Sequence, residues 1–281
     1  MSRINALSIL NAAGSTEEQL AELHGQVIEN VQKSALSARL KNGNWSGDPT
    51  SGTVEFDRFA NAVSEAYGTA RAAAAGNKLK DGKIKVSIDQ DKEIVEEIEA
   101  KDVKLFGVPN IIARRGVNHS LRMAAELDRA FFNELVAAGA EHSFTATELE
   151  DQFEELVQLL ETTENDYVDG VDRSMIYVTV KPSIYGQLKN KLNTLNDRYS
   201  ENENIVGLNG VEVLSNTRQT ADWIAATYQS VGQPVTVDQY QDEKINLSNA
   251  HAVELFYHYG TKCLTPDLVH FAGAAGSVSE A

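Results

Sequence analysis

The sequence has few of the residues that form disulfides and no long apolar run of the kind that crosses membranes. Its single cysteine, Cys263, allows no disulfide within the chain and indicates a reducing compartment, most simply a cytoplasm. No apolar run is long enough to span a bilayer, and the first ten residues, MSRINALSIL, are too short and too polar for a signal peptide. We therefore expect neither a membrane protein nor a disulfide-stabilised secreted domain.

Positive charge is also scarce. The chain has 25 Lys and Arg residues against 41 Asp and Glu residues, which gives a formal net charge of −16. A protein built to bind nucleic-acid phosphates needs the opposite balance. The composition therefore argues against such a protein, and solubility is the simplest interpretation of the charge.

Motifs that carry catalysis are missing as well. The sequence has no P-loop, no G-x-S-x-G elbow and no H-E-x-x-H helix. His251 and His258 lie in a segment rich in strand formers, where a spacing of seven places them on opposite faces. Cys263 is best interpreted as a buried structural thiol. We predict no catalytic, cofactor-binding or metal-binding residue, and no enzymatic activity.

The strongest pattern present is a long amphipathic helix over residues 113–139, with Asn118 as its N-cap and Gly139 as its stop. Its apolar stripe comprises Leu121, Ala124, Ala125, Phe131, Phe132, Leu135 and Val136, together with Asp128. An earlier helix is predicted from the capping box at Ser15 to about Lys41. This first helix packs either on its own core or, as an arm, on a neighbouring molecule.

Two strands, Thr53–Arg58 and Lys83–Asp89, are predicted next. Antiparallel pairing would place the acids of the first strand near Lys83 and Lys85. A two-stranded ribbon is marginal by itself in water, and a connection of more than twenty residues is usually functional. The hairpin therefore either folds back on its own chain or lies across another subunit.

The rest of the chain predicts a mixed α+β protein. An acidic stretch, Asp91–Asp102, indicates a short helix, and Pro109 an extended approach to the long helix. Another helix follows a capping box at Thr147, and a solvated face is the usual explanation for its acids. A strand at Ser174–Val180, a helix from Pro182 and strands near 210–214, 223–228 and 235–240 suggest a compact domain. Closing strands are predicted at 252–259, 260–263 and 268–271.

The order of these segments resembles tailed-phage major capsid proteins of the Hong Kong 97 type. TVEFDRFANAVSEAYGTARAAAAGNKLKDGKIKVSID is similar to the extended loop of that family, and NHSLRMAAELDRAFFNELVAAGAE to its spine helix. DRSMIYVTVKPSIYGQLKN resembles the beginning of the apical domain, and YHYGTKCLTPDLVHFAG the closing peripheral strand. No single motif is specific, and the likeness lies in their order.

The resemblance implies an α+β capsid fold. Its parts would be an N-terminal arm (1–50), an extended loop hairpin (51–90), a peripheral domain (91–165 and 246–281) and an inserted apical domain (166–245). It implies hexamers and pentamers that close an icosahedral shell around double-stranded DNA, with location in a virion assembled in the bacterial cytoplasm. Scaffolding would be a separate protein, because no acidic coiled coil precedes the arm. A portal and decoration proteins are further expected partners, and DNA would be enclosed without sequence-specific binding.

We hypothesise that the basic tip of the hairpin crosses acidic surface on the next subunit, with apolar ribbon residues adding affinity. The candidate inter-subunit contacts are Val54, Phe56, Lys78, Lys80, Lys83, Lys85, Glu96, Glu97 and Asp102. An encapsulin-type bacterial compartment is an alternative with the same fold. A free-standing soluble α+β enzyme with an unrecognised site is an alternative of another class.

Overall fold

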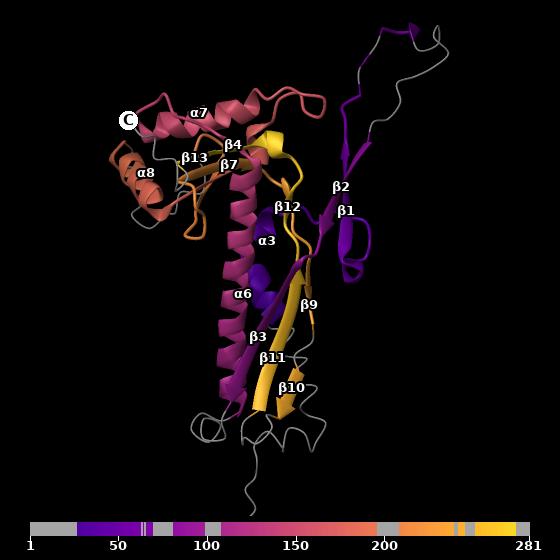
Figure 1. The fold of residues 1–281 in the computed structure, drawn as a ribbon. Coiled ribbons are helices and arrows are strands. Elements are labelled where there is room, and N and C mark those ends of the chain that lie inside the picture. Colours follow the sequence, from indigo (N-terminus) through magenta and orange to yellow (C-terminus); the bar gives the residue numbers. More distant parts are fainter. Residues whose placement is uncertain are drawn as a thin grey trace, which may run out of the picture.

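The computed structural model describes residues 27–62, 64, 66–69, 81–98, 108–195, 208–238, 241–244 and 251–273. One long helix, α6, runs through the molecule and joins two different packing arrangements (Figure 1). Strands β3, β10 and β11 lie along its lower part, and a second sheet with helices α7 and α8 covers its upper end. A hairpin of β1 and β2 projects from the body beyond the strands.

Helix α6 spans Val108–Ala138, roughly 46 Å at 1.5 Å per residue. It begins earlier than predicted, so Asn118 lies inside it and is not its N-cap. Pro109 occupies the first turn, where its missing N–H costs no helical hydrogen bond, and does not mark an extended approach. The predicted stop is confirmed: the Gly139 N–H donates to the Leu135 carbonyl at 2.9 Å. A Cβ at Gly139 would lie 2.7 Å from that oxygen.

The buried face of α6 supplies two clusters of apolar side chains. Met123, Ala124 and Leu127 pack with β11, and Phe131, Phe132 and Leu135 pack beneath the upper sheet. Most of the predicted stripe is thus confirmed. Leu121 is the exception, because its side chain is 48% exposed.

The first described segment packs on its own chain. A helical stretch over residues 27–34 leads to α3 (Leu36–Leu40), and Val27, Val31, Ala35 and Leu40 are all buried. The first three lie against α6 and β11, and Leu40 lies among Phe131, Phe132 and Leu135. Between the two alternatives, these residues therefore favour packing on their own core. The predicted capping box at Ser15 lies outside the described residues.

Asp128, which is 1% exposed, connects this segment to both parts of the fold. Its carboxylate accepts from the N–H groups of Leu36 (3.2 Å) and Ser37 (2.8 Å) at the start of α3. Arg218, from the connection between β6 and β7, donates to the same carboxylate at 2.6 Å. The N-cap residue of α3, Ala35, has no capping side chain. Asp128 therefore caps α3 from a distant part of the sequence and pairs with a cation of the upper sheet.

The lower sheet contains β3 (Gln90–Ile98), β9 (Val235–Val237), β10 (Gln241–Lys244) and β11 (His251–Tyr259). Strand β11 is central and pairs antiparallel with the other three. The predicted helix over Asp91–Asp102 is therefore wrong over its described part, since residues 91–98 are strand. Pairing with β11 over nine residues overrides the helical spacing of Ile94, Val95 and Ile98, and turns Val95 outward.

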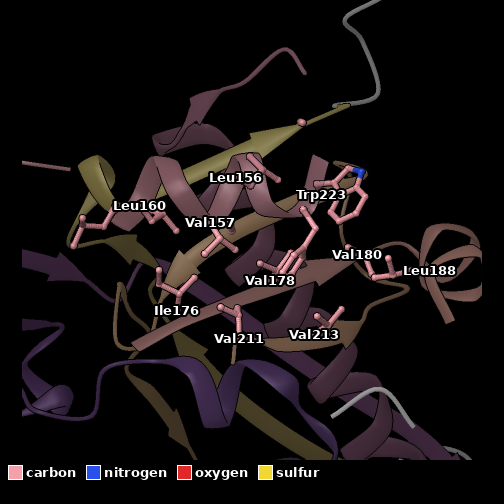
Figure 2. Close-up of a cluster of buried hydrophobic side chains, with 14 residues drawn as sticks. Leu156, Val157, Leu160, Ile176, Val178, Val180, Leu188, Val211, Val213 and Trp223 are labelled. Carbon is pink, nitrogen blue, oxygen red and sulfur yellow. The ribbon is translucent and has the colours of Figure 1, made fainter. Parts of the chain in front are cut away.

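The upper sheet has five strands in the order β4-β13-β7-β5-β6. They are β4 (Ala140–Glu141), β5 (Ile176–Val180), β6 (Glu212–Ser215), β7 (Trp223–Thr227) and β13 (Val269–Ala272). Helices α7 (Leu149–Glu161) and α8 (Pro182–Leu195) pack against it. Figure 2 shows Leu156, Val157 and Leu160 of α7 pointing onto Ile176 and Val178 of β5.

Sheet membership differs from the predicted division of the chain. Residues 235–237 form a strand as predicted, but this strand pairs with β11 in the lower sheet. Strand β13, predicted to close the peripheral domain, lies between β4 and β7 in the upper sheet. Pairing between segments far apart in sequence decides both cases, and no local pattern reveals it. Two shorter strands, β8 (Val231–Gly232) and β12 (Lys262–Cys263), pair with each other.

The acids of α7 are bound within the chain. Its N-cap is Glu148, without a side-chain capping bond, so the predicted capping box at Thr147 does not form. Lys191 of α8 pairs with Glu148 and with Glu150 (2.5 Å). Arg173, in a 3₁₀ turn over Arg173–Met175, pairs with Glu154 and with Glu161 (2.7 Å). The predicted solvated face is therefore an incomplete explanation, because cations that follow α7 in sequence neutralise much of it.

None of the helices in the described part of the chain combines the length and apolar composition that crossing a bilayer requires.

The carboxylate of Asp128 generates a stability prediction. Asp128→Ala leaves Arg218 without its partner and two N–H groups of α3 without an acceptor. We expect a loss of about 3–5 kcal/mol in the free energy of unfolding. Asn133→Ala, at an exposed position of the same helix, should change it by less than about 0.5 kcal/mol. Denaturant unfolding followed by circular dichroism measures both, and equal stability of the two variants would contradict the role of Asp128.

Candidate assembly surface

The hairpin is formed by β1 (Thr53–Phe59) and β2 (Asp81–Ser87), paired antiparallel as predicted. Its inner face is closed by its own chain. Val54, Phe56 and Val86 are each at most 2% exposed and pack with Leu264. Both side chains are therefore covered within their own chain and offer no exposed apolar face, and their contact with another subunit stays a prediction.

Two glycines let the base of the hairpin approach the body this closely. A Cβ at Gly232 would lie 2.6 Å from the ring of Phe56. A Cβ at Gly260 would lie 1.9 Å from the carbonyl oxygen of Ser87. Because Ser87 presents backbone at this contact, no side-chain rotation can relieve the clash. The hairpin base therefore requires glycine at these positions.

The outer face of the hairpin carries its charges. Glu55 lies opposite Lys85, and Asp57 opposite Lys83, which confirms the predicted cross-strand arrangement. The Glu55 carboxylate lies 3.4 Å from the Lys83 ammonium and 3.2 Å from that of Lys85. Hydrogen bonds from Lys85 and Lys83 lower the pKa of Glu55. The two lysines are thus exposed but balanced locally by acids, whereas Lys78 and Lys80 lie outside the described residues.

The acids of β3 point in two directions. Asp91, Glu93 and Glu97 are exposed on one face, beside the half-exposed Val95. Glu96 faces α6, where it pairs with Arg115 and lies 3.0 Å from the Nε2 of His119. Glu96 is therefore engaged within its own chain, and Glu97 is the predicted contact that stays open to solvent. Asp102 lies outside the described residues.

The described residues contain little that points to catalysis. Cys263 is buried, as predicted, and burial raises the pKa of its thiol to about 11, which disfavours the reactive thiolate. Within the described ranges no group of three His, Cys, Asp or Glu side chains could hold a metal ion. His258 lies on the outer face of the lower sheet, with Nδ1 2.7 Å from the Asp91 carboxylate.

Several solved structures superpose on most of this chain. The capsid of cyanophage P-SCSP1u superposes with a TM-score of 0.63 at 12% identity, over 86% of this chain and 89% of the capsid chain. The capsid of Ralstonia phage GP4 gives 0.58 at 12% identity, over 79% and 84%. The chain has the fold of phage capsid proteins. A virus-like particle from Pyrococcus furiosus is also similar, with a TM-score of 0.55 at 10% identity, over 90% and 98%.

No protein-family model and no curated protein sequence matches the chain. The capsid fold is thus retained at identities where side chains have largely changed. The predicted α+β class is confirmed, and the family resemblance is confirmed at the level of the fold. The predicted inter-subunit contacts that stay exposed lie on two surfaces of this fold, the outer face of the hairpin and the exposed face of β3.

The glycine contacts predict how the hairpin base responds to overpacking. Gly260→Ala forces a methyl group into the Ser87 backbone, and we expect a cost of about 1–3 kcal/mol. Faster hydrogen exchange should be confined to residues 53–59 and 81–87. Gly186→Ala in α8 is the matched control, because nothing lies within 4 Å of its Cβ position. Unchanged exchange in the hairpin of the Gly260 variant would contradict the close seating.

His119 predicts a pH dependence. Burial, helped by the positive charge of Arg115, lowers its pKa to about 4, although the Glu96 carboxylate 3.0 Å from its Nε2 acts in the opposite direction. In the unfolded chain this imidazole binds a proton near pH 6.5, whereas in the folded chain it does so only near pH 4. The free energy of unfolding therefore falls as the pH drops from 6.5 towards 4. The full loss is on the order of 3 kcal/mol. Thermal melting of the wild type and His119→Gln at pH 7 and pH 4.5 checks this, and identical pH dependence in both proteins would refute it.

Proposed function

We propose that this chain is the major capsid protein of a tailed phage, a structural protein without enzymatic activity. Copies of the chain would form hexamers and pentamers and close an icosahedral virion shell around double-stranded DNA. The observation that carries the proposal is the capsid fold, shared with two phage capsids over 86% and 79% of this chain. The hairpin adds support, since it projects from the body of the subunit (Figure 1).

Within this proposal the Hong Kong 97 parts are assigned to the observed elements. The arm is assigned to residues 1–50, of which the structure describes 27–50, β1 and β2 begin the extended loop, and α6 is the spine helix. The lower sheet and α6 are the peripheral domain. The upper sheet with α7 and α8 is the apical domain, which shifts its boundaries from 166–245 to include β4 and β13. Scaffolding, portal and decoration proteins are separate partners in this proposal, and the acidic chain encloses DNA without sequence-specific binding.

An encapsulin-type compartment is the second candidate. The particle from Pyrococcus furiosus supports it, because 98% of that chain is covered. Its TM-score of 0.55 is lower than the 0.63 of the cyanophage capsid, and we therefore favour the phage shell. A shell of either kind would be built by the same contacts and would differ in what it encloses.

Expression of the full chain, followed by light scattering and negative-stain microscopy, tests the proposal. We expect closed particles of megadalton mass in addition to any free subunits. A monomer that persists at high protein concentration, under varied salt and pH, would overturn both shell functions. Genes for terminase and portal beside the coding sequence would support the phage shell, whereas a neighbouring cargo-enzyme gene would support the compartment.

We further propose that the charged outer face of the hairpin meets the exposed acids of β3 on the next copy. The support is the exposure of Lys83 and Lys85 on one surface and of Asp91, Glu93 and Glu97 on the other. Each exposed ion pair contributes only about 0–1 kcal/mol, so such contacts would select register and partner through repetition.

Charge reversal of the two lysines tests this contact. Lys83→Glu with Lys85→Glu should lower the yield of closed particles and their tolerance of salt, because two attractive charges become repulsive. The double Lys→Arg variant is the control, since it keeps both charges. Particle yield is measured by gradient sedimentation across a salt series, and equal yields for both double variants would rule the contact out.

A further inference from the structure

Beyond its glycine-seated base, the hairpin meets the body at a second place. Arg58 of β1 leaves the ribbon on its inner side, opposite Gly82. Its guanidinium donates to the Asp267 carboxylate at 2.7 Å, and both side chains are largely covered, at 18% and 28% exposure. Asp267 belongs to a short 3₁₀ turn, Pro266–Leu268, that directly precedes β13. The ion pair therefore connects the outer part of the ribbon to the upper sheet.

A loop after α7 completes this contact. The guanidinium carbon of Arg58 lies 4.1 Å from the centre of the Tyr167 ring, a cation–π distance. The amide of Asn165 donates to the same carboxylate oxygen of Asp267 at 2.6 Å. Immediately after β1, the N–H of Asn61 donates to the carbonyl of Asp166 at 2.8 Å. The loop thus contacts the hairpin segment directly through a ring and a backbone bond, and its Asn165 amide binds the Asp267 carboxylate that pairs with Arg58.

The loop itself is held in shape. The side-chain oxygen of Asn165 accepts from the N–H groups of Tyr167 (2.8 Å) and Val168 (3.0 Å). A bridge between Glu164 and Asp169 closes its two sides. Tyr167 is consequently presented to Arg58 by a fixed turn and not by a free chain. A preorganised partner of this kind restrains direction more than a flexible one would.

A two-stranded ribbon lacks the neighbouring strands that would fix its course over its whole length. Its base is attached through Val54 and Phe56, through a backbone bridge between Ser46 and Glu55, and through the Lys262 ammonium, which donates to the Lys85 carbonyl at 3.1 Å. All of these attachments lie at the end of the ribbon near its base, so they leave the outer part free to change direction. A second attachment at Arg58 removes this freedom, because two separated contacts define a line. The attachment uses groups from three distant parts of the sequence, so it forms only when the upper sheet is folded.

We propose that Arg58, Asp267 and Tyr167 form a clamp that sets the direction of the hairpin and positions its outer part for contact with a second copy of this chain. The role of the clamp in assembly rests on the proposed shell function, but all of its contacts lie within one subunit. These three are positioning residues. They act on assembly through the hairpin and need not touch the neighbouring copy themselves.

The alternative is that the same contacts only stabilise the subunit. A purely structural role would lower the unfolding temperature without changing where the hairpin points. The two roles separate in a distance measurement between the hairpin and the body. Exposed Ala66 on the far part of the hairpin and exposed Asn133 on α6 offer label positions, and the native Cys263 is buried.

The experiment uses the full chain with Ala66→Cys and Asn133→Cys spin labels, diluted into an excess of unlabelled chain. The clamp variants are Asp267→Asn, Tyr167→Leu and Arg58→Lys, of which the last keeps the charge but loses the flat, two-armed guanidinium. Arg39→Lys is the matched control, because Arg39 makes a 2.9 Å ion pair with Glu212 away from the hairpin. Circular dichroism establishes that each variant is folded.

For the wild type and Arg39→Lys we expect one narrow distance distribution and closed particles. Asp267→Asn and Tyr167→Leu should broaden the distribution and lose most closed particles, with Arg58→Lys intermediate. Folded clamp variants with an unchanged distribution would overturn the proposal, as would a broadened distribution with particles of unaltered yield and diameter. Should the wild type form no particles, the shell function fails, while the distance distribution still shows separately whether the clamp holds the hairpin.

Discussion

The buried carboxylate of Asp128 is the interaction on which the arrangement of this molecule depends. A charge taken out of water must find compensating partners, and here they come from two segments that are both distant from α6 in sequence. Helix α6 supplies the carboxylate, α3 supplies two N–H groups, and the connection before β7 supplies Arg218. The segment around α3, the long helix and the upper sheet can therefore satisfy this group only when all three are in place together.

Around this junction the molecule uses one helix for two different cores. Residues of α6 near Met123 serve the sheet centred on β11, and those near Phe131 serve the sheet that contains β7. The acids of α6 are likewise directed to partners on the body: Glu126 accepts from Tyr257 and Tyr259, and Glu134 accepts from the N–H of Cys263. A single helix thereby fixes the relation of the two sheets.

The hairpin is attached to the body by two different kinds of contact. Its base is buried as tightly as a core strand, against backbone at Gly260 and beneath Gly232, whereas its next level is held by polar and aromatic contacts. Polar contacts of partly exposed groups form and break more readily than close packing does. A ribbon with a fixed base and a polar second attachment can keep one direction in a free subunit.

The local pattern of the sequence determined most of the elements. Period-two alternation located β1 and β2, and strand-forming residues located β11. The apolar stripe and Gly139 located α6 and its end, and Pro182 marked the start of α8. The pairing of the acids of β1 with the lysines of β2 also followed from the sequence, because the register of an antiparallel pair determines which residues lie opposite each other. The family resemblance came from the order of these elements, because order survives where identity has fallen to 12%.

Only the tertiary structure decided which faces are covered within the chain and which strands pair. Val54 and Phe56 looked available to a neighbour because alternation reveals an apolar face but not which molecule covers it. Residues 91–98 became a strand because β11 offers nine residues of pairing, and β13 joined the upper sheet through partners far away in sequence. Asp128 stood out as an acid within the apolar stripe of the long helix, but its partners, like those of Arg58 and Tyr167, were not predictable from the sequence. These partners lie about 90 to 210 positions away and are brought together only by packing.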